Sequence, residues 1–234
     1  MAGMIYFDGN AMEIAAPVRV VDIVVGGVEA SPITRDRPIR AGATFIRNHY
    51  GIRSVIITFA LLTESMMERA RQIEALMDWA RSEEPKKLEL PNNPERYLMA
   101  VCTSFPEPSA RKWWENNLSF TFTCYDPFWY DVTEKHAECG NDAFYVGGSG
   151  EPLMRIEDTL SSAAQRVYSD GTDTMTFTLV PAGDLVVDLN NQTAAVGGVS
   201  CMDQFTFAST FIQPKTGTQT ITGSGTVYWR ERWL

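Results

Sequence analysis

The clearest alternation of apolar and polar residues lies between Leu118 and Tyr125. Four apolar side chains fall on one side of this stretch, at Leu118, Phe120, Phe122 and Cys124, and Ser or Thr fill the positions between them. Successive side chains of a β-strand point to opposite faces, so this pattern predicts a strand with one buried face. Apolar and β-branched runs predict four further strands, at residues 18–25, 53–62, 86–90 and 97–103.

Between Ser65 and Ser82 the hydrophobic period changes to that of a helix. Ser65 and Glu68 have the spacing of a capping box, in which the Ser65 hydroxyl accepts from the Glu68 N–H and the Glu68 carboxylate bonds back to the Ser65 N–H. One apolar stripe follows at helical spacing: Met66, Ala70, Ile73, Met77 and Ala80. We therefore expect an amphipathic helix whose methionine-bearing stripe packs on a sheet and binds no ligand.

Strands on both sides of a single helix indicate an α+β domain over residues 1–135, in which the helix covers one face of a mainly antiparallel sheet. Residues 136–150 have low β-propensity and end in the glycine-rich run Gly147 to Gly150, which favours an inter-domain linker. Short β-prone runs follow at roughly ten-residue spacing, separated by turn signals such as Asp170-Gly171. They predict an all-β sandwich over residues 151–234.

The stretch from Ile33 to Arg53 is rich in arginine and lacks sustained hydrophobic periodicity. Its arginines are Arg35, Arg37, Arg40, Arg47 and Arg53. Long irregular connections are uncommon inside compact domains and are usually functional or bound to a partner. We expect an extended arm that contacts a neighbouring subunit, in which arginines pair with acidic groups while Phe45 and Ile46 anchor the contact. The alternative is an internal hairpin that caps its own sheet.

The net charge of −9 is distributed unevenly along the chain. Residues 1–135 hold 15 basic and 18 acidic residues, and residues 136–234 hold 5 and 11. An acidic chain gains no free energy from displacing the counterions of phosphates, so tight non-specific binding of nucleic acid is disfavoured. An acidic surface beside DNA repels it, which suits a conduit.

The four cysteines, Cys102, Cys124, Cys139 and Cys201, include no C-x-x-C pair and signal neither a disulfide framework nor a zinc site. The N-terminus lacks a signal-peptide pattern, and the apolar runs are only as long as strands. We expect reduced thiols in a protein assembled in the cytoplasm, with neither a secretion signal nor membrane insertion.

Catalytic chemistry has few candidate residues. A nucleophilic triad would need His49, in the arginine-rich arm, or His136, in the polar linker, and a solvated or interfacial role suits both better. Gly147 to Gly150 lacks the Lys-Ser/Thr of a phosphate loop. A glycosidase needs only two carboxylates, so this alternative stays open. Its candidates lie in turns or at outward strand positions: Asp170, Asp173, Asp184 and Asp188. We expect no enzyme, no metal and no cofactor.

Two aromatic groups lie outside the predicted core faces. Trp113 and Trp114 follow a basic, proline-containing loop and fit either a buried interface or a platform for a sugar. The second group comes after the strand at 118–125: Pro127, Phe128, Trp129 and Tyr130. We expect the second group to pack at the junction of the two domains, with Pro127 turning the chain.

The order of these features resembles the bacteriophage distal tail protein family, called Dit. The stretches that carry the resemblance are Gly51-Ile52-Arg53 entering a strand, Ile73 to Trp79 in the helix, the strand around Arg96-Tyr97, Phe120 to Tyr125 with Asp126-Pro127-Phe128-Trp129-Tyr130, and the terminal Trp229-Arg230-Glu231-Arg232-Trp233. Together they cover nearly the whole chain, and the strand ending in Asp-Pro-Phe-Trp-Tyr is the most specific of them.

The resemblance implies an α+β domain with a split-barrel-like sheet and one helix, followed by a galectin-like sandwich. It also implies a virion protein of the tail tip, whose first domains form a homohexameric ring between the tail tube protein and the tail hub protein. DNA would be passing cargo, and the second domains would carry receptor-binding or baseplate parts. The chain has no room for the carbohydrate-binding insertions of longer members. A carbohydrate-binding module, a cell-wall hydrolase and a tail tube protein remain alternatives.

Overall fold

The computed structural model describes residues 4–36, 43–63, 65–106 and 117–234. The chain forms two compact units, Met1–Trp129 and Tyr130–Leu234. Four residues singled out in the sequence lie outside the described ranges: Arg37, Arg40, Trp113 and Trp114.

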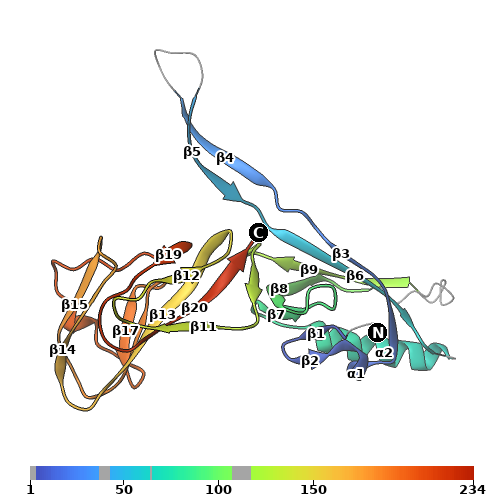
Figure 1. Ribbon diagram of the computed structural model, residues 1–234. Helices are drawn as coiled ribbons and strands as arrows, with labels where there is room; N and C mark the ends of the chain where they lie inside the picture. The colour runs from blue at the N-terminus through green and yellow to red at the C-terminus, as the bar shows by residue number, and fades with distance from the viewer. Residues whose placement is uncertain (1–3, 37–42, 64, 107–116) are drawn as a thin grey trace. The chain divides into compact units, whose positions relative to one another are not determined.

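One antiparallel sheet forms the centre of the first unit (Figure 1). From one edge to the other, its strands are β3 (Val18–Val25), β6 (Arg53–Leu61), β9 (Asn117–Cys124), β8 (Arg96–Ser104), β7 (Lys86–Glu89), β1 (Tyr6–Phe7) and β2 (Asn10–Ala11). The antiparallel sheet and its five longer strands are thereby confirmed.

The buried face of this sheet follows the alternation in the sequence. In β6, Val55, Ile57 and Phe59 are buried, and the residues between them are more exposed. Ile57 lies opposite Phe120 of β9, and the rings of Phe59 and Phe120 stack with centroids 5.2 Å apart. Each such side chain stabilises the fold by about 1.5–3 kcal/mol when it is buried. The two strands therefore anchor the core of the first unit.

Helix α2 (Met66–Ala80) packs on this buried face, since Trp79 lies 6.0 and 6.1 Å from the rings of Phe120 and Phe122. The side chains that it buries are Arg69, Gln72, Ile73, Leu76 and Ala80. Met66 and Ala70 are exposed, so the expected stripe is wrong at its start. The buried face is rotated about the helix axis from the expected stripe: Arg69, Gln72 and Leu76 are buried in place of Met66, Ala70 and Met77, while Ile73 and Ala80 belong to both.

The start of α2 is capped as the sequence predicts, with one difference. The Ser65 hydroxyl accepts a hydrogen bond from the Glu68 N–H at 3.2 Å. The Ser65 N–H donates to the hydroxyl of Thr63, which in turn lies 3.3 Å from the Glu68 carboxylate. Thr63 thus completes the capping box that Glu68 alone was expected to close.

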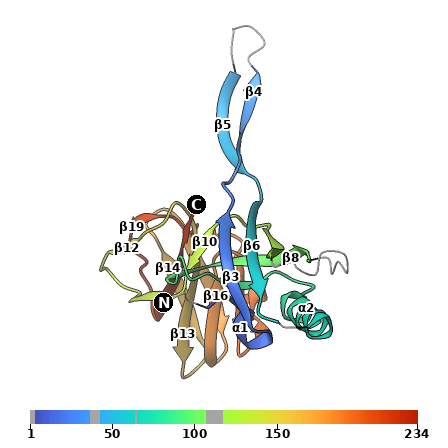
Figure 2. The same cartoon turned by 90° about the vertical axis from the view of Figure 1, so that its right-hand side faces the viewer.

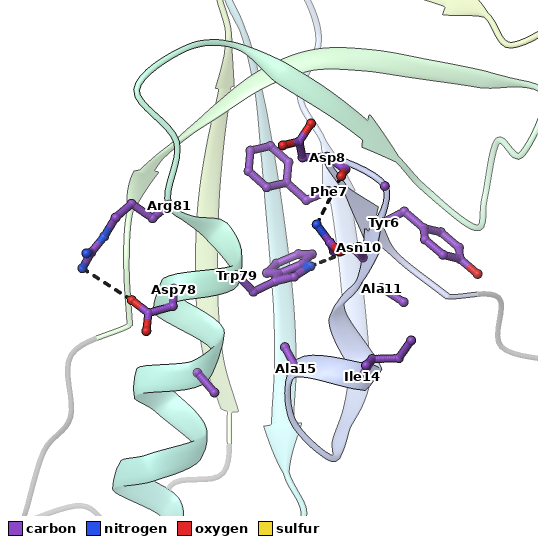
Figure 3. A pocket seen from close by; sticks show the side chains of 12 residues that line it. Tyr6, Phe7, Asp8, Asn10, Ala11, Ile14, Ala15, Asp78, Trp79 and Arg81 are labelled. Atoms are coloured by element: carbon purple, nitrogen blue, oxygen red, sulfur yellow. Dashed lines mark hydrogen bonds and ion pairs between the residues drawn. The ribbon is translucent and has the colours of Figure 1, made fainter.

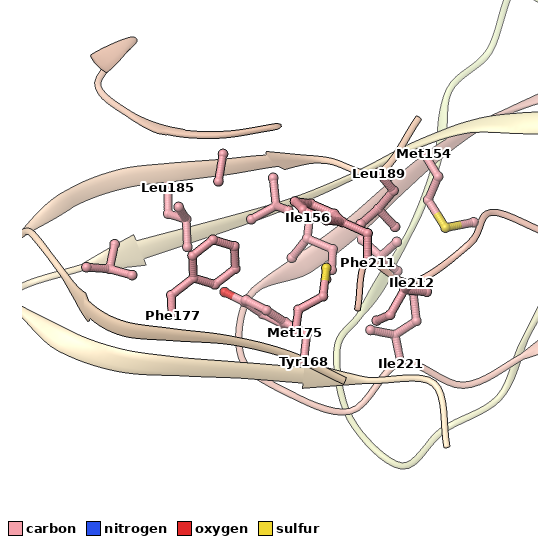
Figure 4. Packing of buried hydrophobic residues seen from close by; sticks show 14 of the residues in the cluster. Met154, Ile156, Tyr168, Met175, Phe177, Leu185, Leu189, Phe211, Ile212 and Ile221 are labelled. Atoms are coloured by element: carbon pink, nitrogen blue, oxygen red, sulfur yellow. The ribbon is translucent and has the colours of Figure 1, made fainter. Parts of the chain in front are cut away.

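The second unit is an all-β sandwich. Its main sheet runs β18 (Val199–Ser200), β17 (Thr193–Val196), β16 (Gly183–Asp188), β13 (Gly150–Leu160) and β20 (Thr226–Trp233), with β11 (Lys135–Glu138) also paired to β20. Two strand pairs complete it: β14 (Ala164–Ser169) with β15 (Thr174–Val180), and β12 (Phe144–Val146) with β19 (Gly217–Gln219). Phe177 of β15 and Leu185 of β16 converge in the shared core (Figure 4).

The expected linker at residues 136–150 is wrong. Residues of this stretch form β11 and β12, and His136 pairs with Tyr228 of β20. The chain divides earlier, between Trp129 and Tyr130, within the short strand β10 (Trp129–Asp131). Tertiary pairing with a long neighbouring strand outweighs weak local β-propensity. Gly147 is required for close approach, because a Cβ there would lie 2.6 Å from the carboxylate of Glu231.

Candidate subunit interface

The arginine-rich stretch forms a two-stranded arm that projects from one end of the sheet in the first unit (Figures 1 and 2). Strands β4 (Ala30–Asp36) and β5 (Ala43–Tyr50) pair only with each other. The Gly51 N–H donates to the carbonyl oxygen of Glu29 at 2.8 Å and closes the base of the arm. The side chains described in this arm are exposed as far as His49. A hairpin that capped its own sheet would bury some of them, so that alternative does not fit the described residues.

The two faces of the arm differ in chemistry. Arg47 lies directly opposite Ile33, and Arg35 is two residues further along the strand of Ile33, so both arginines lie on one face. Phe45 lies opposite Thr34 on the other face, next to a bulge at Ile46. Phe45 is 58% exposed and Ile46 is 55% exposed. Within the described residues, the guanidinium groups of Arg35 and Arg47 have no hydrogen-bond or ion-pair partner. The arm therefore offers cations and apolar anchors that the first unit does not use.

Arg53 differs from the other arginines of this stretch because it is buried. It therefore does not belong with the exposed residues that could contact a neighbouring subunit. Its side chain is buried, with 8% of its surface exposed, and its Nε donates to the carbonyl oxygen of Pro127 at 2.8 Å. Its Nη1 donates to the carbonyl oxygen of Gly26 at 3.3 Å, and its guanidinium lies 5.9 Å from the ring centroid of Trp129. Burial lowers the pKa of Arg53. These contacts hold the base of the arm against the end of β9.

The aromatic run after β9 also packs near the base of the arm. The ring of Phe128 lies 5.8 Å from that of Tyr50, edge to face, and Trp129 and Tyr130 are buried. The expectation that Pro127 and these three aromatic residues pack at a junction between two domains stays a prediction.

Strand β3 presents a second surface that fits a protein partner. In the part of the chain that the structure describes, β3 pairs with β6 alone, so the backbone groups of its other edge face outward. Val21 and Val24 of this strand are about half exposed, and Ile56 of β6, opposite Val24, is partly exposed too. An unpaired edge with apolar side chains is a template for strand addition by another chain.

A cavity of about 460 Å³ lies where the turn between β1 and β2 meets helix α1 (Met12–Ala15) and the C-terminal half of α2 (Figure 3). Trp79 forms part of its wall, and the Trp79 Nε1–H donates to the carbonyl oxygen of Asn10 at 2.8 Å. Ile14 stands at the cavity with 83% of its surface exposed. Asp8 and Gly9 form the turn with positive φ angles of 51° and 78°.

Two of the four carboxylates weighed for a glycosidase, those of Asp170 and Asp188, have structural roles. Asp170 accepts hydrogen bonds from the N–H groups of Thr172 and Asp173, and although burial opposes ionisation, these bonds lower the pKa of Asp170. Asp188 accepts from the N–H groups of Asn190 and Asn191 in another turn. Within the described residues, no group of three or more His, Cys, Asp or Glu side chains is placed to hold a metal ion. None of the described helices combines the length and apolarity needed to cross a membrane.

Exposed aromatic side chains test the carbohydrate-binding alternative, which expects coplanar rings on a concave face. In the second unit, whose residues are all described, the strongly exposed aromatic residues are Tyr145 of β12 and Phe207 in the loop after the 3-10 helix η2 (Met202–Gln204). No ring contact joins them. This arrangement gives no support to a stacking platform.

Comparison with solved structures shows a Dit-like fold over the whole chain. The crystal structure of the Dit protein (gp 19.1) of SPP1, described as a paradigm of the hub adsorption apparatus in phages that infect Gram-positive bacteria, matches with a TM-score of 0.76 at 16% identity and covers 99% of both chains. A chain in the phage P2 baseplate, in its activated conformation with Ca, matches with a TM-score of 0.54 at 11% identity, over 93% of this chain and 90% of that chain. No protein-family model and no curated protein matches this chain.

Proposed function

We propose that this chain is a structural subunit of a phage tail tip, which assembles in the host cytoplasm into a homohexameric ring. The ring joins the tail tube protein to the tail hub protein and carries receptor-binding or baseplate components. The observation that carries the proposal is the match to SPP1 Dit over 99% of both chains.

Two surfaces of the first unit support a ring. A head-to-tail contact that closes on itself requires each subunit to present two different patches, one to each neighbour. The exposed arm and the cavity between α1 and α2 are such patches, because they differ in chemistry and in position. Both combine apolar side chains with unused polar groups, as interfaces in stable assemblies do.

The charge of the chain supports a passage for DNA. The net charge is −9, so a ring of several copies carries a large negative charge. Such a ring repels phosphates instead of holding them, and DNA passes as cargo without being bound.

Mass measurement of the purified full-length chain tests the proposal. We expect a species of six copies at micromolar concentration or above, and antibody labelling of virions at the tail tip alone. Long tubes, or labelling along the whole tail, would identify a tube protein instead. A strict monomer at every concentration, combined with unlabelled tails, would contradict the proposal. Calorimetric titration with host cell-wall polysaccharide distinguishes the proposal from the carbohydrate-binding alternative, because only the alternative predicts micromolar binding.

A further inference from the structure

The arm and the cavity of Figure 3 lie at opposite ends of β3. The cavity is lined by Ala15, which ends α1 just before β3 begins at Val18, and the arm starts at Ala30 after β3 ends at Val25. Eight strand residues span roughly 26 Å at 3.3 Å each. The arm also extends away from the body of the first unit (Figures 1 and 2). One copy therefore cannot place its own arm in its own cavity.

The cavity has the features of a preformed receptor for an apolar side chain. Trp79 is fixed by its hydrogen bond to Asn10 and by an edge-to-face contact with Phe7 at 5.9 Å. Ile14 is exposed beside it and adds an apolar surface at the mouth of the cavity. Pockets of roughly 300–1,000 Å³ hold drug-sized ligands, so about 460 Å³ admits an aromatic and a branched side chain together.

The charges at the cavity complement those of the arm. Asp78 forms an ion pair with Arg81 at 3.7 Å, which leaves the carboxylate of Asp8 as the uncompensated charge. Within the described residues, that carboxylate has no hydrogen-bond or ion-pair partner. The arm carries the opposite charge on Arg35 and Arg47, which lie on the face opposite Phe45 and therefore do not enter the cavity with it. Surfaces of opposite charge attract each other and speed the encounter of two proteins without forming a direct ion pair.

We infer that the arm of one copy docks in the α1–α2 cavity of a second copy, with Phe45 and Ile46 beside Ile14 and Trp79. This inference rests on the proposed ring and names the contact that builds it. Because the two patches differ, the contact is head-to-tail, and it leaves a free arm at one end and a free cavity at the other until the ring closes. Truncating an anchor at such a contact weakens self-association by roughly ten-fold or more.

Cysteine cross-linking of two single variants of the full chain tests this docking. Phe45→Cys chains are mixed with Ile14→Cys chains and oxidised, and a disulfide forms only if the two Cα atoms come within about 7 Å. Three native cysteines are buried, and burial raises the pKa of the fourth, Cys139, to about 11, so the native thiols react slowly. We expect covalent dimers in the mixture and none when either variant is oxidised alone.

Ile52→Cys is the matched control, because Ile52 is an isoleucine of the same unit that is 57% exposed and does not line the cavity. Mixing it with Phe45→Cys is expected to give no dimer. If the mixed variants form the six-copy ring but no disulfide between positions 45 and 14, the docking is overturned and the proposed function is left intact. Cross-linked dimers without a six-copy species would support the docking and contradict the ring. Absence of both cross-link and assembly would overturn both.

Discussion

Arg53 donates from Nε to the carbonyl oxygen of Pro127 at 2.8 Å, and this bond ties the first strand after the arm to the turn after β9. Replacement of Arg53 by Leu leaves the buried carbonyl oxygen of Pro127 and the partly buried carbonyl oxygen of Gly26 without this donor. We expect a loss of about 2 kcal/mol in the free energy of unfolding. Urea titration measures it, with Arg71→Leu on the exposed face of α2 as a control that changes stability by less than about 0.5 kcal/mol. Equal effects of the two substitutions would show that the buried bonds are dispensable.

Asp158 makes the stability of the second unit depend on pH in the acidic range. Burial alone would raise the pKa of Asp158, but hydrogen bonds from Ser224 at 2.6 Å, from Arg166 and from Tyr168 at 3.2 Å lower it. A carboxylate whose pKa is lowered in the folded state stabilises that state above its unfolded pKa of about 4, and the contribution is lost as the pH falls further.

The Asp158→Asn substitution isolates this contribution. We expect it to reduce the free energy of unfolding by about 2 kcal/mol at pH 7, and by progressively less as the pH falls below about 4, because protonation of the carboxylate in the unfolded state, and then in the folded state, removes the contribution of the ionised group. Asp142→Asn, at an exposed position, is the control and is expected to change stability little at either pH. A difference from wild type that stayed constant between pH 7 and pH 3 would count against an ionised Asp158.

Gly171 and Gly225 have the same φ angle but different surroundings. Replacing each by alanine therefore distinguishes the cost of a strained backbone from the cost of a steric clash. Gly171 and Gly225 both have a φ of 85°. A Cβ at Gly171 meets nothing within 4 Å, whereas at Gly225 it collides with the Glu157 carbonyl oxygen and lies 2.8 Å from the Asp158 Cβ. We expect Gly171→Ala to cost about 1–2 kcal/mol, the cost of the left-handed conformation, and Gly225→Ala to cost several kcal/mol or prevent folding. Circular dichroism during thermal unfolding compares them, and equal melting temperatures would refute the crowding argument.

The cationic face of the arm is expected to contribute to assembly through charge. The double substitution Arg35→Glu with Arg47→Glu should lower self-association roughly ten-fold at low salt, and less at high salt because ions screen exposed charges. Mass measurement over a range of protein and salt concentrations follows the effect. Arg71→Glu, at an exposed position on α2, is the control. An unchanged mass distribution in the double variant would remove this face from the contact.

Elements with a strong local pattern could be predicted from the sequence. The alternation in β9 and the capping box at Ser65 are local signals, and both appear in the structure. The boundary between the units could not be predicted, because β11 and β12 depend on partners far along the chain in β20 and β19. A weak strand sequence takes its conformation from its partner, which local composition does not report.

The candidate interface was predicted only in part. The density of arginines indicated the arm, but it could not separate Arg53, whose burial depends on carbonyl groups at Gly26 and Pro127. The α1–α2 cavity was missed entirely. Its one local signal was the Asp8-Gly9 turn, and the remainder comes from α2 lying beside the N-terminal residues, more than sixty positions apart.

The open edge of β3 has a consequence for the chain before it meets any partner. Six of its eight residues are valine or isoleucine, and such a strand readily pairs with its own copies in the manner that begins aggregation. Arg19 and Asp22 interrupt the run with exposed charges, which oppose this self-pairing. Newly synthesised chains therefore depend on the charges of Arg19 and Asp22 to disfavour edge-to-edge pairing of β3 between copies.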